Sequence, residues 1–552
     1  MKHVLLAQLA LMTSLTAAEI IRQPTEARFW LRVPSSQPLL KDLRVSNGNV
    51  NLAVWEKDAA VRERLTDITF PIHWWTWSET TVCFTPAYDG MLDLVLNGPW
   101  AADQNGAVFR QEVLWDEITA EGTNLKNGGF ETITDGHPDA WESPWAACPG
   151  TKAWPLKETS ALKGKAVAAS WNNRPLSQAI HVRLGRPVTL VLHARAATPP
   201  DFIPPRRLGA DTPAHRAATL LKRGVNLGNG WESPPNAAWR IHFTPEDIDH
   251  IADEGFDHVR VPVAFQFYLK QGTNGLEISP DLLAELEPVL HRALDRKLRV
   301  LLDWHNFNEF TTAPAEQLAR FTGGWQSVAR HFRSWPSGIF LELLNEPNNA
   351  LTTEALTPIY QNAISAIRAI DPTRIIVVSP GSWGSIRELD GLRLPDSDDH
   401  IIVTVHCHEP FPFTHQGAGW VGYQDLKGIR YPGPPEKTCQ LPASLSENAG
   451  LRAFIAAYNT QPTEINPSSS RPVREMLDVA LAWSNYFGRP IHLGEFGSHN
   501  VGDLASRARY LRDVRILSEQ RHIPWTMWEW KSGFGYWDPQ ANKPRFRASL
   551  FE

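Results

Sequence analysis

Two glutamates stand in short motifs that could perform acid–base and nucleophilic chemistry. Glu346 lies in the stretch LNEP, and Glu495 lies in the stretch LGEFG. Cleavage of a glycosidic bond needs one carboxylic acid to protonate the leaving oxygen and one carboxylate to attack or to activate water. Each motif alone is a weak signal. Together, at the ends of two predicted strands, they favour glycoside hydrolysis.

Further polar and aromatic residues follow other predicted strands. Arg260 lies on the second strand, His305 ends the third, His406 ends the sixth, and Trp528 stands near the end of the eighth. The carboxyl ends of the strands form the active-site face of a parallel barrel. We therefore expect these side chains to converge with the two glutamates. A buried imidazole bonded to backbone is the alternative for each histidine.

The elements that would position these side chains alternate between strand and helix. The predicted strands are Gly224–Leu227, His258–Val263, Arg299–Trp304, Ile339–Leu344, Arg374–Val378, Ile401–Val405, Pro490–Leu493 and Trp525–Trp530. Helical periodicities include Pro280–Lys297, Thr353–Ile370, Val473–Tyr486 and Asp503–Glu519. Eight strands over roughly 335 residues fit an α/β fold, a (β/α)8 TIM barrel, better than an open doubly wound sheet.

Two other features concern the barrel region. No GxGxxG stretch follows a predicted strand and no P-loop is present, which argues against nucleotide binding. From Trp420 to about Ser470 the sequence lacks sustained periodicity. Loops of that length are functional or disordered, so we expect this one to form a wall of a substrate cleft.

The first 200 residues predict all-β domains. Short alternating runs such as Thr81–Phe84 and Leu92–Leu96 are separated by turn residues. A second β-rich segment opens at Asn124, and residues 199–207 are rich in proline, which is typical of a linker. We expect a β-sandwich over residues 19–120, a second one over 121–200, a linker over 201–215 and the barrel over 216–552. One larger composite sandwich is the alternative.

Composition restricts the partners. The chain is globular, with 42% hydrophobic and 21% charged residues, and its formal net charge is −6. No basic run tracks phosphate, so nucleic acid is excluded as an expected partner.

There are 23 Trp against 9 Tyr. The apolar indole faces suit the C–H faces of sugars, and Trp75 and Trp77 would share one strand face as a binding platform; packing between the sheets is the alternative.

The N-terminus predicts export. Lys2 and His3 precede an apolar run, and small residues end at Ala18, which is typical of a cleaved signal peptide over residues 1–18. No other apolar run is long enough to span a bilayer, so we expect a secreted or periplasmic monomer.

Of the four cysteines, Cys407 and Cys439 could form a bridge. No cluster has zinc-ligand spacing, and we expect neither metal nor cofactor.

The barrel resembles family five of the glycoside hydrolases, within the clan of retaining (β/α)8-barrel glycosidases. The matching stretches are RGVNLGN from Arg223, HVRVP from His258, LNEP from Leu344, FTHQGA from Phe413, LGEFG from Leu493 and WEWKSGFG from Trp528. They follow the family's order over residues 223–535. The resemblance is greatest to bacterial endo-β-1,4-glucanases, some of which also accept β-mannan. The stretch NGGFE, residues 127–131, weakly resembles the opening strand of carbohydrate-binding modules.

The resemblance implies catalytic roles for three residues. Glu495 would be the nucleophile, kept ionised by the Arg260 cation. Glu346 would be the general acid in the first step and the base that activates water in the second. Asn345 would bond the sugar 2-hydroxyl.

The resemblance also implies how substrate is held. His305 and His406 would hold hydroxyls and orient the acid. Trp528 would form the floor beneath the attacked sugar. Four further residues complete the expected cleft. Trp383 and Trp420 would be stacking surfaces, and Asn229 and Glu232 would line the opposite end.

Two departures from the family pattern are present. Many relatives carry a tyrosine two residues after the strand-six histidine, and this chain has His408 there. An imidazole N–H could donate the same bond to the nucleophile, but imidazoles change charge near neutral pH, so a changed pH profile is expected. Relatives also often pair two histidines on strand three, whereas here His305 stands between Trp304 and Asn306.

The sequence therefore predicts an endo-acting β-1,4-glucanase that acts on polysaccharide by double displacement. The alternatives are a β-mannanase or another β-glucan hydrolase, a non-catalytic carbohydrate-binding protein, and a metal-dependent barrel hydrolase. The sequence alone leaves the polysaccharide, and the choice between internal and terminal attack, undecided.

Overall fold

The structure, a computed structural model, describes residues 24–34, 40–46, 48–58, 61–100, 109–135, 137–142, 161–198, 202–273, 275–305 and 307–552. The chain divides into two compact units, Met1–Ile203 and Pro204–Glu552. The expected signal peptide, residues 1–18, lies outside the described residues. Among the described residues, no helix combines the length and the apolar character needed to cross a lipid bilayer.

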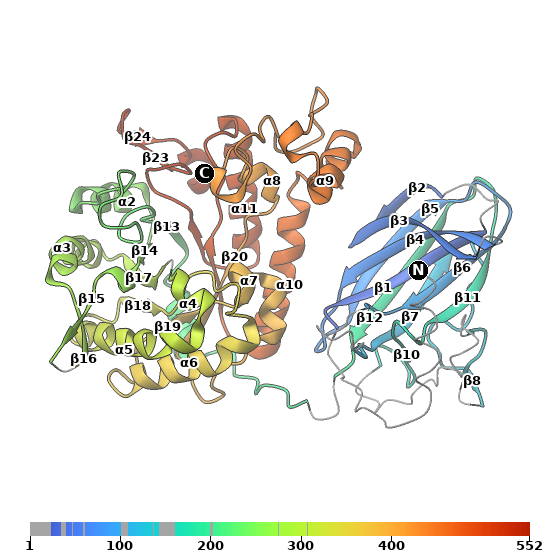
Figure 1. The fold of residues 1–552 in the computed structure, drawn as a ribbon, viewed down its shortest axis with the longest axis horizontal. Helices are drawn as coiled ribbons and strands as arrows, with labels where there is room; N and C mark the ends of the chain where they lie inside the picture. Colours follow the sequence, from blue (N-terminus) through green and yellow to red (C-terminus); the bar gives the residue numbers. More distant parts are fainter. Residues whose placement is uncertain are drawn as a thin grey trace. The chain divides into compact units, whose positions relative to one another are not determined.

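The first unit is built from two antiparallel sheets (Figure 1). One sheet has the order β11 (Leu176–Val182), β6 (Gly90–Asn97), β1 (Glu26–Pro34), β4 (Val61–Pro71) and β3 (Asn49–Asp58). The other has the order β10 (Ala168–Ser170), β7 (Val113–Glu121), β12 (Val188–Ala196), β5 (Ser78–Thr85) and β2 (Lys41–Val45). A small pair, β8 (Ile133–Thr134) with β9 (His137–Pro138), lies outside both.

These sheets form one sandwich, which corrects the preferred expectation of two. β6 pairs with β11, where Leu96 lies opposite Leu176, and β12 pairs with both β5 and β7. Phe29, Phe70 and Trp115 pack edge to face between the two sheets, with ring centroids 6.1–6.4 Å apart. Because these pairings join residues about 70 to 115 positions apart, periodicity within each strand could not reveal them. The composite sandwich that the sequence left open is the observed one.

The second unit contains a closed barrel of eight parallel strands. In barrel order they are β13 (Arg223–Asn226), β14 (His258–Val263), β17 (Arg299–Trp304), β18 (Ile339–Glu342), β19 (Ile376–Val378), β20 (Ile401–His406), β21 (Ile491–Glu495) and β22 (Trp525–Met527). All eight predicted strands are present, with ends that differ by a few residues. The predicted (β/α)8 fold is confirmed.

Helices surround this barrel (Figure 1). They are α1 (Pro213–Ala218), α2 (Pro245–Glu254), α3 (Pro280–Asp295), α4 (Asn308–Thr312), α5 (Pro314–Phe332), α6 (Thr353–Arg368), α7 (Gly381–Gly384), α8 (Phe411–Thr414), α9 (Ala449–Thr460), α10 (Arg471–Phe487), α11 (Leu504–Gln520) and α12 (Arg547–Phe551). Two hairpins are added, β15 (Leu269–Gly272) with β16 (Gly275–Ile278), and β23 (Trp537–Asp538) with β24 (Lys543–Pro544). Several helices begin where the sequence provides a cap: Ser279 accepts from the Asp281 amide and Asp503 from the Ser506 amide.

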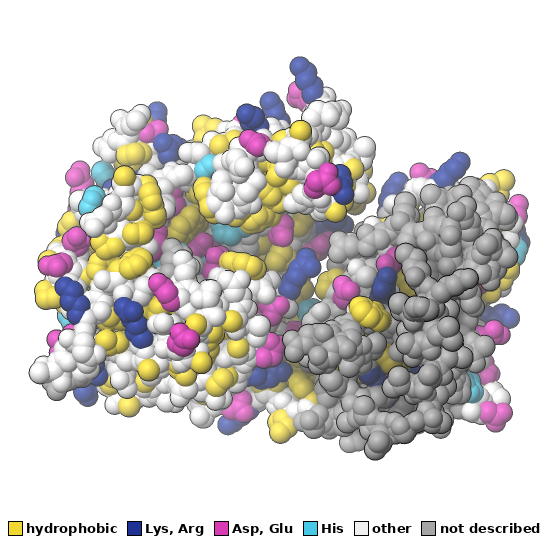
Figure 2. Space-filling view, viewed as in Figure 1, with side chains coloured by type: hydrophobic (Ala, Val, Ile, Leu, Met, Phe, Trp, Pro, Cys, Tyr) yellow, Lys and Arg dark blue, Asp and Glu magenta, His cyan; other side chains and the backbone are white. Residues whose placement is uncertain are grey.

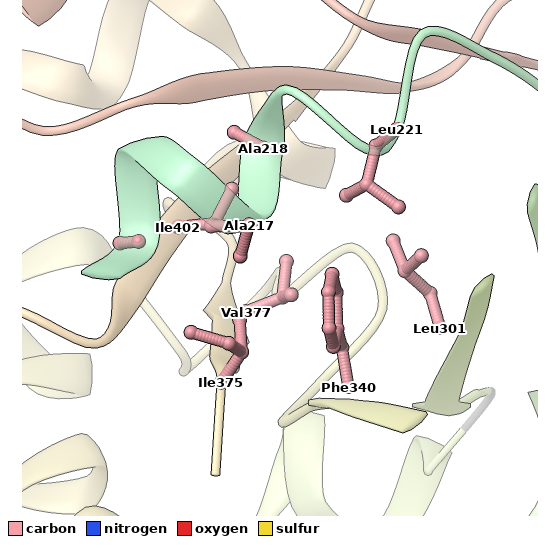
Figure 3. Packing of buried hydrophobic residues seen from close by; sticks show 9 residues of the cluster. Ala217, Ala218, Leu221, Leu301, Phe340, Ile375, Val377 and Ile402 are labelled. Carbon is pink, nitrogen blue, oxygen red and sulfur yellow. The ribbon is translucent and has the colours of Figure 1, made fainter. Parts of the chain in front are cut away.

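The amino-terminal end of the barrel is closed by α1. Ala217, Ala218 and Leu221 face Leu301, Phe340, Val377 and Ile402 of the barrel strands (Figure 3). This apolar plug occupies the end opposite the expected active site, so chemistry is confined to the carboxyl ends of the strands.

Three further expectations need correction. Part of the predicted linker, residues 201–215, belongs to the barrel unit, since the amide of Leu208 donates to the carbonyl of Phe487 and α1 begins at Pro213. The segment 420–470 is not only loop, because it contains α9. Cys407 and Cys439 are not bridged: both are free thiols, and the buried Cys407 Sγ lies 4.0 Å from Met476 Sδ.

Candidate active site

Glu495 stands at the end of β21 and is held by two basic side chains. Its Oε1 accepts from Arg260 Nη1 at 2.7 Å, and its Oε2 lies 3.5 Å from His408 Nε2. Burial alone would raise the pKa of this carboxyl, but the charge of His406, the His408 contact and Arg260 lower it well below the usual value. Glu495 is therefore an ionised, oriented carboxylate, the form that a nucleophile needs.

Glu346 follows β18 and is paired with an imidazole. Its Oε1 lies 2.8 Å from His406 Nδ1, and its side chain is 26% exposed. The backbone of Glu346 has a φ of 43°, in the left-handed region that non-glycine residues rarely adopt. Burial lowers the pKa of His406, but the charges of Glu495 and Glu346 outweigh burial and raise it. His406 thus couples the two carboxyl groups.

The two glutamates lie close together. A carboxylate oxygen of Glu346, a nitrogen of His406 and a carboxylate oxygen of Glu495 all lie within 4.8 Å of one another. Retaining glycosidases hold their two carboxyl groups about 5–5.5 Å apart, and inverting enzymes need about 6.5–9.5 Å to admit a water. The observed spacing fits direct attack by one carboxylate.

A fully buried guanidinium organises the base of the site. Arg260 donates to both oxygens of Glu342 at 2.7 and 2.9 Å, and its Nη2 lies 3.0 Å from Asp303 Oδ2. The same cation donates to Asn345 Oδ1 at 2.8 Å and to Asn226 Oδ1 at 3.0 Å. Burial raises the pKa of Glu342, although Arg260 opposes the rise. The cation therefore links β13, β14, β17 and β18 to Glu495.

Asp303, Glu342 and Asn226 were missed in the sequence. A signal was present, because charged residues inside strands that are buried on both faces are unusual. Asp303 also precedes His305 by two residues on one strand, which places both on the same face.

His305 and Trp528 form one side of the site. The imidazole Nδ1 of His305 lies 2.6 Å from Asp303 Oδ2, and its ring stacks on the Trp528 indole with centroids 5.7 Å apart. Burial opposes charging of His305, but Asp303 raises its pKa above the usual value. His305 is therefore held in place as a hydrogen-bond donor beside the half-buried indole of Trp528.

Asn229 and Glu232 lie in the segment after β13. Asn229 Nδ2 donates to Ser532 Oγ at 2.7 Å, and the Asn229 amide donates to Glu232 Oε1. Burial raises the pKa of Glu232 to about 7, against the opposing charge of His305. Glu232 Oε2 is buried and has no partner among the described residues. The Glu232 carboxyl can thus accept a hydrogen bond when it is ionised or donate one when it is protonated.

The two further tryptophans are exposed. Trp383 on α7 is 58% exposed and Trp420 is 66% exposed. Trp420 meets His499 edge to face at 5.2 Å and lies 6.4 Å from Phe534, contacts that hold the indole without covering it. Figure 2 shows hydrophobic side chains of the barrel unit beside histidine and acidic side chains. Both tryptophans are therefore surface groups and not core residues.

Known proteins match the barrel. The family model of cellulases, glycosyl hydrolase family 5, matches residues 223–533. Endoglucanase 3 of Fibrobacter succinogenes is 28% identical over 341 residues, covering 58% of this chain; the match spans 51% of that relative, about half its length. Endoglucanase C of Acetivibrio thermocellus is 29% identical over 328 residues, covering 56% of this chain and 91% of the relative.

Solved structures of other proteins also match the barrel. Cel5A of Thermotoga maritima, in complex with mannotriose, is 29% identical with a TM-score of 0.53, covering 61% of this chain and 99% of that chain. The cellulose synthase subunit Z of Clostridioides difficile is also 29% identical, with a TM-score of 0.51, over 60% of this chain and 100% of that chain. The predicted resemblance and the predicted enzyme class, a hydrolase of O-glycosyl bonds, are confirmed. Because the family model covers more than half of the sequence, this chain belongs to glycosyl hydrolase family 5.

Proposed function

We propose that the whole protein is a retaining endo-β-1,4-glucanase in which Glu495 is the nucleophile and Glu346 the acid and base. The observation that carries the proposal is the pair of carboxyl groups within 4.8 Å, one bonded to a buried cation and the other to an imidazole. This asymmetry supports the proposed roles. The carboxylate beside Arg260 is kept ionised, whereas Glu346 is exposed enough to exchange a proton with the leaving oxygen.

In the first step, a Glu495 oxygen attacks the anomeric carbon while Glu346 protonates the departing sugar oxygen. A glycosyl–enzyme ester forms, and the charge of Glu495 disappears. In the second step, Glu346, now a carboxylate, takes a proton from water, which attacks the same carbon and frees Glu495. Two inversions give net retention. His406 lies close to both carboxyl groups and can stabilise whichever is charged.

The surrounding side chains suit a sugar. Arg260 occupies the oxygen of Asn345, and no described residue accepts from its Nδ2, which leaves the amide N–H groups for the sugar 2-hydroxyl. Trp528 offers an apolar face beside His305. Trp383 and Trp420 offer exposed faces for neighbouring sugars, since pyranose C–H faces pack well on indole. His408 supports Glu495 in place of the expected tyrosine.

A β-mannan is the second candidate substrate. Structures of Thermotoga maritima Cel5A are described with mannotriose and with cellobiose, so that relative binds both sugars. Glucose and mannose differ at carbon 2, where Asn345 would bind. Product analysis on carboxymethylcellulose, glucomannan, galactomannan, xylan and mixed-linkage glucan separates these candidates. A rapid fall in viscosity with few reducing ends on the cellulose derivative supports the proposal, and cleavage of galactomannan alone rejects it.

Three further expectations remain proposals. Residues 2–18 support export of the protein. The composite sandwich would assist binding of polysaccharide, although Trp77 is half-buried beneath Arg195, whose guanidinium lies 5.3 Å from the ring. We also propose a monomer. Light scattering tests the monomer, and a pull-down of an inactive full-length variant on insoluble cellulose, compared with a Trp75→Ala form, tests the role of the sandwich.

A further inference from the structure

Directly beneath the catalytic residues, four polar side chains fill a part of the barrel that usually holds aliphatic residues. They are His258, Thr404, His492 and Thr526, and all four are completely buried. Each precedes a site residue on the same strand. His258 stands two residues before Arg260, Thr404 two before His406, Thr526 two before Trp528, and His492 three before Glu495.

These side chains form one continuous hydrogen-bonded chain across four strands. Asp257 Oδ1 lies 2.8 Å from His258 Nδ1, and His258 Nε2 lies 2.7 Å from Thr526 Oγ1. Thr526 Oγ1 then lies 2.8 Å from His492 Nε2, and His492 Nδ1 lies 3.2 Å from Thr404 Oγ1. The chain therefore links β14, β21 and β20, which carry Arg260, Glu495 and His406, with β22, which ends just before Trp528.

The direction of every bond follows from the first. The Asp257 carboxylate can only accept, so His258 Nδ1 donates to it, and in a neutral imidazole His258 Nε2 then accepts from the Thr526 hydroxyl. Since Thr526 has one proton, its oxygen accepts from His492 Nε2, and His492 Nδ1 accepts from Thr404. Burial and the nearby cations lower the pKa of His492 well below the usual value. His492 thus contributes two hydrogen bonds and no charge.

Two glycines make room for this chain. A Cβ on Gly224 would lie 2.0 Å from His258 Nε2. A Cβ on Gly494 would lie 2.5 Å from Thr404 Oγ1 and 3.0 Å from His406 Nε2. Any larger residue at either position would displace an imidazole or a hydroxyl of the chain. The backbone beside Glu495 is therefore matched to the polar layer below it.

We propose that His258, Thr526, His492 and Thr404 are positioning residues that hold the strands carrying Arg260, His406 and Glu495 at their catalytic spacing. The inference rests on the proposed roles of Glu495 and Glu346. Aliphatic side chains would fill the same space but would not fix the relative register of four strands, whereas directional bonds do. The titratable and charged groups that face His492 are His258, Arg260 and His406, so a neutral support avoids a further cation beside His406.

Thr526→Val tests the proposal, because valine keeps the shape of threonine and removes the hydroxyl that joins the two imidazoles. We expect kcat on the substrate that the wild type cleaves best to fall about tenfold or more, since small displacements of catalytic groups are costly. KM should stay within twofold. The pH profile should also move, because a looser contact with Glu495 raises the pKa of His406 less.

Thr526→Ser should restore both kcat and the pH profile, since serine retains the hydroxyl. Tyr360→Phe is the matched control, because the buried Tyr360 hydroxyl donates to the Ser379 carbonyl on the outer side of the barrel at 2.6 Å. It should lower the melting temperature without moving the pH profile. If Thr526→Val does not fold, Thr404→Val with Thr404→Ser makes the same comparison at the other end of the chain.

An unchanged kcat and pH profile in Thr526→Val, with a loss of melting temperature like that of Tyr360→Phe, would show that the layer only fills space and would overturn the inference. A fall in kcat that serine does not restore would overturn it as well. Failure of the proposed function itself would appear elsewhere, as normal turnover in a Glu495 variant, so the two failures are distinguishable.

Discussion

The sandwich and the barrel bury different kinds of side chain. In the sandwich, apolar and outward-facing residues alternate along β12, and the aromatic rings of Phe29, Phe70 and Trp115 fill the space between sheets. Its ion pair of Arg28 with Asp67 is only partly buried. In the barrel, Arg260 and three carboxylates are almost fully removed from water. Burial of apolar area stabilises a fold, whereas burial of charge costs free energy unless every partner is in place.

This difference indicates which of the two interiors serves function. A region that buries a charge network is retained for chemistry, because well-packed apolar residues of similar volume would often be at least as stable. Among the described residues of the sandwich, one group is comparable, Asp116, but its carboxylate accepts the amides of Leu162, Lys163 and Glu117 and so holds a loop. The predictions below test this division between a catalytic and a structural interior.

The largest effect is expected from Glu495→Ala. Loss of the nucleophile should lower kcat on the order of 10⁴- to 10⁶-fold while folding and polysaccharide binding persist. The sandwich control is Asp116→Asn, whose amide N–H groups would face the amides of Leu162 and Lys163; it should lower the melting temperature and leave kcat within twofold. Kinetics and calorimetry on the full chain measure both. Near-normal turnover in Glu495→Ala would refute the assignment.

The next effect is expected from Glu346→Ala, and it should depend on the leaving group. Polysaccharide hydrolysis should fall by about 10²- to 10⁴-fold, the usual contribution of a general acid. The first step on a dinitrophenyl β-cellobioside should be nearly unaffected, because dinitrophenolate leaves without protonation. Added azide should accelerate turnover of the variant by replacing the activated water. An equal loss on both substrates would assign Glu346 another role.

A third comparison uses one arginine from each region. Arg260→Met should lower the free energy of unfolding by about 3–5 kcal/mol, because it leaves buried carboxylates without their cation. Arg28→Met should cost about 0–1 kcal/mol, as partly exposed pairs do. Denaturant unfolding followed separately for the two units gives both values. Equal costs would contradict the distinction drawn between the two interiors.

The smallest effect concerns pH. Burial raises the pKa of Glu232 and of Glu529 to about 7, so between pH 4.5 and about 7 these two groups bind more protons in the folded barrel than in the unfolded chain. Their contribution to stability is greatest at the acidic side and falls as pH rises through this window. Below pH 6.5 the buried His415 and His492, whose pKa values are lowered, act in the opposite direction because they bind fewer protons in the folded barrel. His305 and His406, with raised pKa values, extend the fall above pH 6.5.

We expect the melting temperature of the barrel to drop on the order of 5–10 °C as pH rises above 6.5, where the groups with raised pKa values lose their protons and the histidines with lowered pKa values no longer oppose them. The transition of the sandwich should move less, and calorimetry of the full chain at matched ionic strength can resolve the two. A barrel transition that rises with pH above 6.5 would contradict the assignment of these buried groups.

Much of the barrel was predictable. Every predicted barrel strand is present because each is a short apolar run whose local pattern survives in the fold. Glu346, Glu495 and Arg260 were identified because strand ends in a parallel barrel meet at one face. The composite sandwich was not predictable in the same way, since β6 finds its partner β11 across about 80 residues. Helix α9 was missed although the sequence carried a signal, since its buried Leu451, Ile455 and Tyr458 recur at helical spacing after the Asn448 cap.

The sequence by itself determined which groups are available for catalysis and on which strands they stand, because residue type and periodicity are local properties. Only the tertiary structure decided how those groups act on one another. Closure of the barrel brings Arg260 into contact with Glu342 and Glu495, and His406 into contact with Glu346. These contacts join residues 60 to 235 positions apart, and charge and proton affinity depend on distances of a few ångströms that no local pattern encodes.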